Sequence, residues 1–246
     1  MRDLLRHETF RSGLPELAIC LVLRDLCHAL DYLHHQGVVH RAVRASHILG
    51  EELLIIGVYK YFFCILVTDT CAVLTGLRYS TPLQATGEGR PNLYSFPLHG
   101  VTANLAWLAP EILQQNLLGY NEASDLYSLA VTVCEMATGA VPFADLAPTL
   151  MMVEKLAVGA APSLGDRAAE FSSHLSQLVA VCGSADQQLR PAARDLLGHP
   201  CIKQLKKTNT SLGTLLAGTP RIQFSPCDNV DSEDRTSDTS KLSWIF

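Results

Sequence analysis

The residues best placed to do chemistry in this chain of 246 residues stand in five short motifs. In chain order the motifs are His40-Arg41-Ala42 followed by His47, Leu74-Thr75-Gly76-Leu77-Arg78, Ala109-Pro110-Glu111, Ser124-Asp125-Leu126-Tyr127-Ser128 and Leu189-Arg190-Pro191. Histidine moves protons near neutral pH and ligates metals, so His47 is a candidate base or metal ligand. No carboxylate remains in its motif to share a metal, which favours a packed loop histidine.

The order of these motifs resembles the C-terminal lobe of protein kinases, over roughly residues 15 to 205. The segment from His40 to His47 stands in place of the catalytic loop H-R-D-L-x-x-x-N, and Gly76-Leu77-Arg78 stands in place of D-F-G. Ala109-Pro110-Glu111 is an intact A-P-E. The resemblance implies a mainly α fold, a kinase-like C-terminal lobe at residues 1–207 with a small β-hairpin region.

The residues that would carry phosphoryl transfer in such a lobe are replaced. The transfer needs a carboxylate that accepts or orients the substrate hydroxyl, and this position holds Ala42. The metal-binding Asn of the family is His47, and the metal-binding Asp is Gly76. Magnesium prefers oxygen ligands, so the resemblance predicts no catalysis and no metal site.

The N-terminal half of the kinase pattern is not found in the sequence. There is no Gly-rich loop and no strand lysine that would hold the phosphates of ATP, and the match begins where the lower lobe begins. We therefore expect the N-terminal lobe to be absent. Members of the resembled family bind ATP, but this chain by itself is expected to need no cofactor.

The residues that hold the lobe together are kept. The resemblance implies that Glu111 pairs with Arg190 as a buried ion pair, which is costly to break. It also implies that Asp125 accepts hydrogen bonds from the backbone near His40 and Arg41. We expect these five residues to be structural.

The altered motifs themselves resemble the STE20-related adaptor pseudokinases. The matching segments are Arg44-Ala45-Ser46-His47-Ile48-Leu49, Leu74 to Arg78, Pro110 to Tyr120 and Val141-Pro142-Phe143. The resemblance implies an adaptor that binds and allosterically activates a tumour-suppressor serine/threonine kinase. A helical-repeat scaffold protein is implied as the third partner.

The end of the chain supports the same resemblance. The adaptor family closes on Trp-Glu-Phe, which the scaffold grips, and this chain closes on Trp244-Ile245-Phe246. Aromatic side chains bury a large area at modest entropic cost, as at interface hot spots. We expect residues 208–246 to form a disordered tail that ends in this docking motif. The alternative is a terminus that binds nothing.

An apolar segment near residues 51–69 departs from the family pattern. Residues 43–75 separate Ala42 from Gly76, where the family has one short hairpin. The run from Leu53 to Val67 is interrupted by Lys60 and is shorter than the roughly 20 residues of a membrane span. Its β-branched and aromatic residues favour a buried strand, and we expect no membrane contact.

Periodic apolar residues predict the elements that position the motifs. Ile19, Leu23, Leu26, Leu30 and Leu33 share one face of a helix over 15–36. A buried helix is expected over 121–138, ended by Gly139. Further helices are expected over 111–118, 148–158, 170–182 and 191–197, with short strands over 38–78 and a long loop over 79–106.

The overall composition is that of a globular domain with 48% apolar residues. A net charge of -5 gives no basic field for nucleic acid. None of the eight cysteines stands in a C-x-x-C pair, which favours reduced thiols and neither a zinc site nor a disulfide scaffold. We expect a cytoplasmic protein, with the nucleus as a second compartment.

Two other interpretations remain open at this point. The chain could be a truncated isoform that lacks adaptor activity, either because it is unstable or because it competes with a longer form. It could also be an enzyme, a kinase that uses unconventional residues, although Ala42 and Gly76 argue against this.

Overall fold

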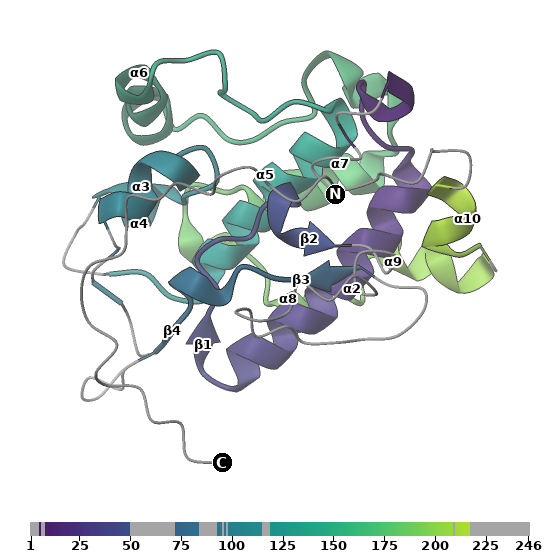
Figure 1. Ribbon diagram of the computed structural model, residues 1–246, viewed down its shortest axis with the longest axis horizontal. Coiled ribbons are helices and arrows are strands. Elements are labelled where there is room, and N and C mark those ends of the chain that lie inside the picture. Colours follow the sequence, from purple (N-terminus) through teal and green to yellow (C-terminus); the bar gives the residue numbers. More distant parts are fainter. Residues whose placement is uncertain are drawn as a thin grey trace, which may run out of the picture.

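The computed structural model describes most of the chain between residues 8 and 216 (Figure 1). The described residues are 5, 8–49, 72–83, 93, 94, 96, 98–114, 119–208 and 210–216. The apolar segment near 51–69 and the terminal Trp244-Ile245-Phe246 lie outside the described residues.

The N-terminal part of the fold is dominated by one long helix, α2 (Glu16–His35), which follows the short 3-10 turn Glu8–Phe10. Pro15 stands at its N-cap with an extended backbone, and Gly37 follows its end with a φ of 68°. A left-handed residue just past a helix is the geometry that glycine adopts at least cost. The predicted apolar face is confirmed, because its five residues are all buried.

Two small antiparallel sheets follow α2. In the first, β1 (Val38–Val39) pairs with β4 (Thr81–Pro82). In the second, β2 (Ile48–Leu49) pairs with β3 (Val73–Leu74), so that Ile48 lies opposite Leu74. The second pair brings the two sides of residues 50–71 together, which places the segment after His47 beside the segment before Gly76.

The middle of the chain corrects one prediction. The long loop expected over 79–106 contains β4 and the helix α3 (Leu98–Asn104). Its Gly, Pro, Ser and Thr content favours a loop, but Val101 of α3 packs against buried clusters that include Leu108 and Ala106. Tertiary packing therefore supports a helix that composition alone does not predict. The helix α4 (Pro110–Gln114) follows.

The central helix of the fold is α5 (Ala123–Thr138), as the sequence predicts. Fourteen of its sixteen residues are buried, and Gly139 ends it with a φ of 76°. The backbone N–H of Gly139 donates to the carbonyl of Glu135. A helix buried nearly all round fixes the position of any polar side chain that it carries, and this matters for Asp125.

The remaining elements are short helices, most of which pack against α2 or α5, while the first of them and the turn after it lie beside α4. They are α6 (Pro148–Val153), a π turn (Glu154–Val158), a 3-10 segment (Gly165–Glu170), α7 (Ser173–Cys182), α8 (Ala193–Leu196), α9 (Pro200–Lys203) and α10 (Leu212–Leu216). Three further 3-10 turns span Ala45–His47, Leu77–Tyr79 and Gln187–Leu189, and a fourth spans Gln204–Lys207. The helices predicted over 148–158 and 170–182 are present.

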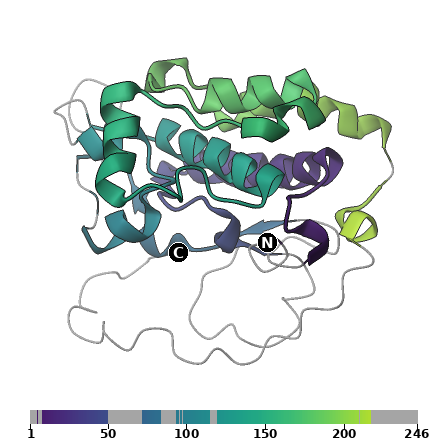
Figure 2. The same ribbon diagram turned by 90° about the horizontal axis from the view of Figure 1, so that it is seen from above.

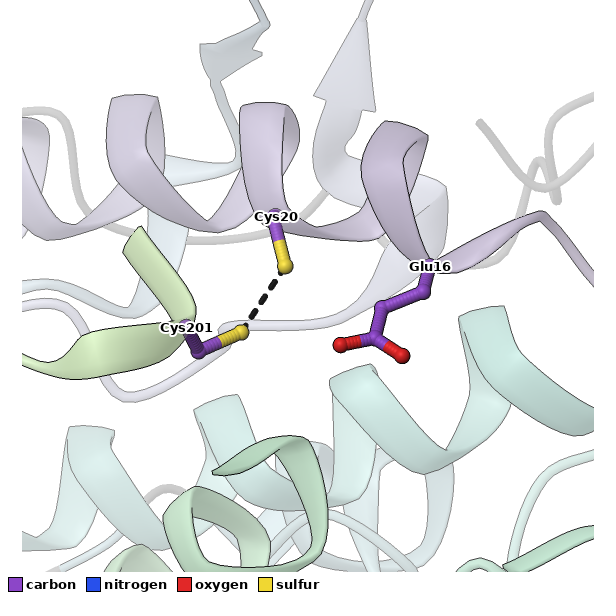
Figure 3. Close-up of side chains that lie close together, drawn as sticks. All are labelled: Glu16, Cys20 and Cys201. Atoms are coloured by element: carbon purple, nitrogen blue, oxygen red, sulfur yellow. Dashed lines mark hydrogen bonds between the residues drawn. The ribbon is translucent and has the colours of Figure 1, made fainter. Parts of the chain in front are cut away.

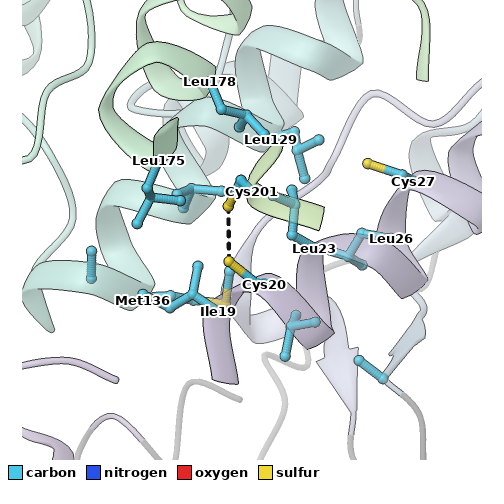
Figure 4. Packing of buried hydrophobic residues seen from close by; sticks show 14 of the residues in the cluster. Ile19, Cys20, Leu23, Leu26, Cys27, Leu129, Met136, Leu175, Leu178 and Cys201 are labelled. Atoms are coloured by element: carbon cyan, nitrogen blue, oxygen red, sulfur yellow. Dashed lines mark hydrogen bonds between the residues drawn. The ribbon is translucent and has the colours of Figure 1, made fainter. Parts of the chain in front are cut away.

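The main core lies between these helices. Figure 2 shows α2 and α5 side by side, with the C-terminal helices along one side and the strands along the other. Leu23 and Leu26 of α2 meet Leu129 of α5 and Leu178 of α7 in this core (Figure 4). Each fully buried leucine contributes about 1.5–3 kcal/mol of transfer free energy, so this cluster supplies much of the drive to fold.

The start of the expected tail is corrected by α10. The sequence predicts disorder from residue 208 onward, but Leu212 is buried in the main core and α10 contacts α2. Leu212 and the partly buried Leu215 pack this short helix against the main core. Residues 217–246 lie outside the described part of the chain. Within the described part, no helix is both long and apolar enough to span a membrane.

Candidate functional site

The loop from His40 to His47 joins β1 to β2 and carries the first motif. Its backbone is held by Asp125 of α5, whose Oδ2 accepts from the N–H of His40 at 2.8 Å and whose Oδ1 accepts from the N–H of Arg41 at 2.8 Å. Arg41 has a φ of 65°, a left-handed conformation that costs a non-glycine residue about 1–2 kcal/mol. Hydrogen bonds to a buried carboxylate, about 1.5–3 kcal/mol each, offset that cost.

Asp125 receives a third donor from α2. The ring of His34 lies with its Nε2 2.9 Å from Oδ2 of Asp125, which is fully buried. Burial alone raises the pKa of Asp125, but the hydrogen bond and electrostatic attraction of His34 outweigh it, together with the hydrogen bond from the backbone N–H of His40, so the pKa is lowered. The carboxylate therefore ties α2, α5 and the loop into one unit.

His40 links the loop to the segment that holds Gly76. Its Nδ1 accepts from the N–H of Ala42 at 3.2 Å, which leaves Nε2 to donate to the carbonyl of Thr75 at 3.0 Å. Burial lowers the pKa of His40, in keeping with a neutral ring. Because both ring nitrogens have partners inside the fold, His40 acts as a brace between the loop and β3.

Ala42 and His47 occupy the positions where the resembled motif carries its acid and its amide. Ala42 is buried and has only a methyl group to offer. Nδ1 of His47 donates to the carbonyl of Ala42 at 2.8 Å, and Nε2 accepts from the guanidinium of Arg44 at 3.1 Å. Burial, assisted by the charge of Arg44, lowers the pKa of His47 to about 4. His47 is thus a neutral ring with both nitrogens engaged.

Gly76 lies directly against the His47 ring. Gly76 has a φ of 86°, and a Cβ added there would stand 2.5 Å from Cγ and Nδ1 of His47. Contacts shorter than 3.0 Å force a neighbour to move, and the ring is held by its two hydrogen bonds. The imidazole therefore fills the volume that any side chain at position 76 would enter.

The two residues expected to form an ion pair, one in α4 and one directly after the 3-10 turn Gln187–Leu189, are in contact. Nη1 of Arg190 lies 2.6 Å from Oε1 of Glu111, and Nη2 lies 2.8 Å from Oε2, which is a bidentate arrangement. Both side chains are buried, and Ser124 Oγ also donates to Glu111 at 3.0 Å. Paired and hydrogen-bonded in this way, two charges can remain inside a protein.

The magnesium ion that phosphoryl transfer requires does not fit these residues. Gly76 has no ligand atom, and Ala42 has no oxygen on its side chain. His47 has one ring nitrogen protonated toward Ala42 and the other turned to a cation. A hard divalent cation prefers carboxylate, carbonyl or water oxygens, so this set of side chains offers it no cage.

The match to a family model decides the fold family. A model of the protein kinase domain matches residues 78–202, which is just over half of the chain. The chain belongs to the protein kinase family. Its α5, with the carboxylate that holds the His40–Arg41 backbone, is the buried central helix of the kinase lobe that the sequence resembles.

Within the kinase family, the chain is similar to proteins named as adapters. It is 40% identical over 199 residues to the STE20-related kinase adapter protein alpha of Rattus norvegicus, which covers 78% of this chain and 46% of that protein. For the Mus musculus alpha protein the identity is 34%, over 80% of this chain and 52% of the relative. For the Homo sapiens beta protein it is 29%, over 92% and 63%. The chain spans about half the length of the first curated relatives it matches.

Sequence reasoning missed a buried lysine in this kinase lobe. Nζ of Lys155 donates to the carbonyls of Leu105, Ala106 and Leu108 at 3.0, 2.5 and 2.9 Å. The ammonium lies 5.1 Å from the ring of Tyr127, and burial lowers the pKa of Lys155 to about 7. The available signal is its position one helical turn after the buried Met151, on the apolar face. Lys155 anchors the segment before the A-P-E motif.

The structure does not describe every predicted site residue. Glu111, Asp125 and Arg190 are placed as above, and so is the loop of His40 and Arg41. The docking motif Trp244-Ile245-Phe246 lies outside the described residues, so its capture by a partner stays a prediction.

Proposed function

We propose that this kinase-family chain is a pseudokinase adaptor that binds a client serine/threonine kinase and activates it allosterically. A tumour-suppressor kinase is the client implied by the resemblance, and a helical-repeat scaffold protein is the third partner. The names of the relatives support the adaptor class, because each is called a kinase adapter protein. We place this action in the cytoplasm, with the nucleus as a second compartment.

The observation that carries the proposal is the contrast between supporting and chemical residues. The supporting contacts are complete, because Asp125 holds the loop backbone and Glu111 pairs with Arg190. The chemical positions are filled by a methyl group, an engaged imidazole and a glycine. A fold that keeps its shape in this way can present a surface to a partner while it lacks a proton acceptor and metal ligands.

The close approach of His47 and Gly76 argues against an unconventional kinase. An aspartate at position 76 would begin with the Cβ that lies 2.5 Å from the His47 ring. The His47 ring takes up the volume that a side chain at position 76 would need, which supports the proposal, and we expect a single substitution at position 76 not to create a metal site. We expect purified chain to transfer no phosphate, and ATP alone to give no thermal shift above the noise.

The proposal is tested by co-precipitation in two steps. The client and scaffold are first captured with the STE20-related kinase adapter protein alpha, and this chain is then offered to both. The paired substitution Trp244→Ala with Phe246→Ala should abolish scaffold capture. Ser240→Ala with Ser243→Ala is the matched control, because it changes the same segment and leaves the aromatic side chains. Failure of the unmodified chain to bind either protein would remove the proposal.

A second candidate function is competition with longer adaptors. It is motivated by the alignments, which cover 46% and 52% of two relatives, so the matched residues correspond to only part of the surface that those proteins present. A competitor binds the client but lowers the activity obtained with the full-length relative. An adaptor raises the activity of the client when it is added with the scaffold and without the full-length relative. The same client preparation therefore separates the two functions.

A further inference from the structure

Two cysteines from distant parts of the chain meet where α2 crosses α9. Sγ of Cys20 lies 2.8 Å from Sγ of Cys201, and the two residues are 181 positions apart (Figure 3). Both side chains are fully buried. Figure 4 shows them pointing at each other inside a wall of apolar side chains that includes Ile19, Met136 and Leu175. The eight cysteines of the sequence give no sign of this pair, because neither its spacing nor its flanking residues form a motif.

The separation of the sulfurs fits a direct bond better than a shared cation. A disulfide bond is about 2.05 Å long, so the two sulfurs need to approach by only about 0.8 Å. A tetrahedral zinc ion with bonds of about 2.3 Å would need them roughly 3.8 Å apart. Glu16 is the third possible ligand, but its Oε1 and Oε2 already accept from Ser172 Oγ and N–H at 2.5 and 2.8 Å.

The surroundings of the two thiols shift their pKa values in opposite directions. Either thiol can donate in the contact between the two sulfurs, and Nε2 of Gln204 donates to the sulfur of Cys20 at 3.5 Å. The hydrogen bond with Cys201 lowers the pKa of Cys20 against the effect of burial, while the same contact and burial raise the pKa of Cys201. Cys134 is a useful contrast, because burial raises its pKa to about 12 with no such partner. Because the side-chain amide of Gln204 donates to the sulfur of Cys20, a thiolate is better stabilised there, and we assign the first attack to Cys20.

We propose that Cys20 and Cys201 form a redox pair that closes to a disulfide by exchange with a small-molecule disulfide such as oxidised glutathione. The sulfur of Cys20 attacks one sulfur of the small disulfide, which breaks its S–S bond and releases one thiolate. The sulfur of Cys201 then attacks the sulfur of Cys20 and displaces the second thiolate. The two protein thiols lose two protons and two electrons, and the small disulfide is reduced to two thiols.

A Cys20–Cys201 disulfide would link α2 to α9, two helices that are in contact but lie far apart in the sequence. Cys20 lies in the helix that supports the His40–Arg41 loop through His34 and Asp125, and Cys201 lies in the C-terminal helices. Because both sulfurs are buried, exchange must pass through a local opening of the α2–α9 contact. The closed pair constrains a very long loop of the unfolded chain, which favours the folded state.

The test uses the full chain with oxidised glutathione at several urea concentrations below the unfolding midpoint. Peptides are mapped by mass spectrometry before and after reduction. We expect a linked peptide pair containing Cys20 and Cys201, formed faster as urea rises, and a rise in Tm on the order of 10 °C that dithiothreitol reverses. Cys134→Ala is the matched control, since it removes a buried thiol and should leave both results unchanged.

Three results would overturn the proposal. The first is that the linked peptides pair other cysteines while Cys20 and Cys201 stay reduced. The second is that both residues carry only separate glutathione adducts. The third is that the untreated chain retains zinc through a stoichiometric site that is lost in Cys201→Ala. Peptide mapping of the unmodified chain decides the first two without any variant, so a variant that fails to fold does not block the test.

Discussion

The close contact between Gly76 and the His47 ring allows us to predict how much a larger residue at position 76 lowers the free energy of unfolding. The change is Gly76→Ala, which adds only the Cβ that would stand 2.5 Å from Cγ and Nδ1 of His47 and 2.8 Å from Cε1. Two separate costs follow from the structure. One is the backbone cost at a φ of 86°, and the other is the steric cost against the ring.

The magnitudes of these costs can be worked separately. A left-handed backbone costs an L-residue about 1–2 kcal/mol relative to glycine. Forcing one extra carbon into a packed site costs about 1–3 kcal/mol. If the His47 ring moves instead, it gives up its hydrogen bonds to Ala42 and Arg44, worth about 1 kcal/mol each. We therefore expect Gly76→Ala to lower the free energy of unfolding by about 2–5 kcal/mol.

A double-mutant cycle with His47→Ala isolates the steric cost. The free energy of unfolding is measured by urea denaturation for the unmodified chain, each single variant and the double variant. Without the ring, Gly76→Ala should cost only its backbone part of about 1–2 kcal/mol, which gives a coupling of about 1–3 kcal/mol. Additive single effects, within about 0.5 kcal/mol, would show that the ring does not occupy this volume and refute the reasoning.

Three further predictions concern buried charges and histidine. Asp125→Asn should destabilise the fold by about 3–5 kcal/mol in urea denaturation, because an amide cannot accept from both loop N–H groups, and a loss below 1 kcal/mol would contradict its bracing role. Glu111→Gln should cost a similar amount by leaving Arg190 charged and buried, and adding Arg190→Met should recover most of that loss; no recovery would show that the pair is not the cause. The folded pKa of His47 is about 4, against 6.5 unfolded, so the unfolded state binds the proton first and stability falls as the pH drops from 6.5 to 4. The pKa difference of about 2.5 between the two states limits this loss to about 3.4 kcal/mol. His47→Asn should show a correspondingly shallower pH dependence of the free energy of unfolding in urea, and parallel curves would contradict the prediction.

The parts of the fold that could be predicted are those with signals in the neighbouring sequence, such as apolar periodicity and a glycine after a helix. α2 and α5 are long and strongly periodic, and each is followed by a glycine in the left-handed region, Gly37 and Gly139. These signals lie within a few residues of the feature that they determine. The pairing of Glu111 with Arg190 is different, because 79 positions separate the two residues and only the family resemblance connects them.

The features that could not be predicted depend on contacts between distant segments. α10 is ordered because Leu212 finds the core beside α2, and a five-residue helix has no strong signal of its own. Lys155 is buried because three carbonyls from the segment before α4 converge on it. Cys20 and Cys201 meet only because α2 and α9 pack together.

The role of His47 could be assigned only from the sequence and the structure together. The sequence shows that an amide has been replaced by histidine, and it favours a packed ring over a metal ligand. It cannot show that the ring fits against Gly76, because 28 residues lie between them. The antiparallel pairing of β2 with β3 closes that distance, and the positive φ of Gly76 completes the fit.

The most direct test of the adaptor account measures phosphate incorporated into a peptide substrate of the client kinase. The client is the serine/threonine kinase captured with the STE20-related kinase adapter protein alpha, used once as the active enzyme and once with its own catalytic aspartate replaced. With the scaffold present, the chain should raise incorporation by the active client and give none with the inactive client. Incorporation that depends on the chain when the client is inactive, or no change with the active client, would contradict a pseudokinase that works through its surface alone.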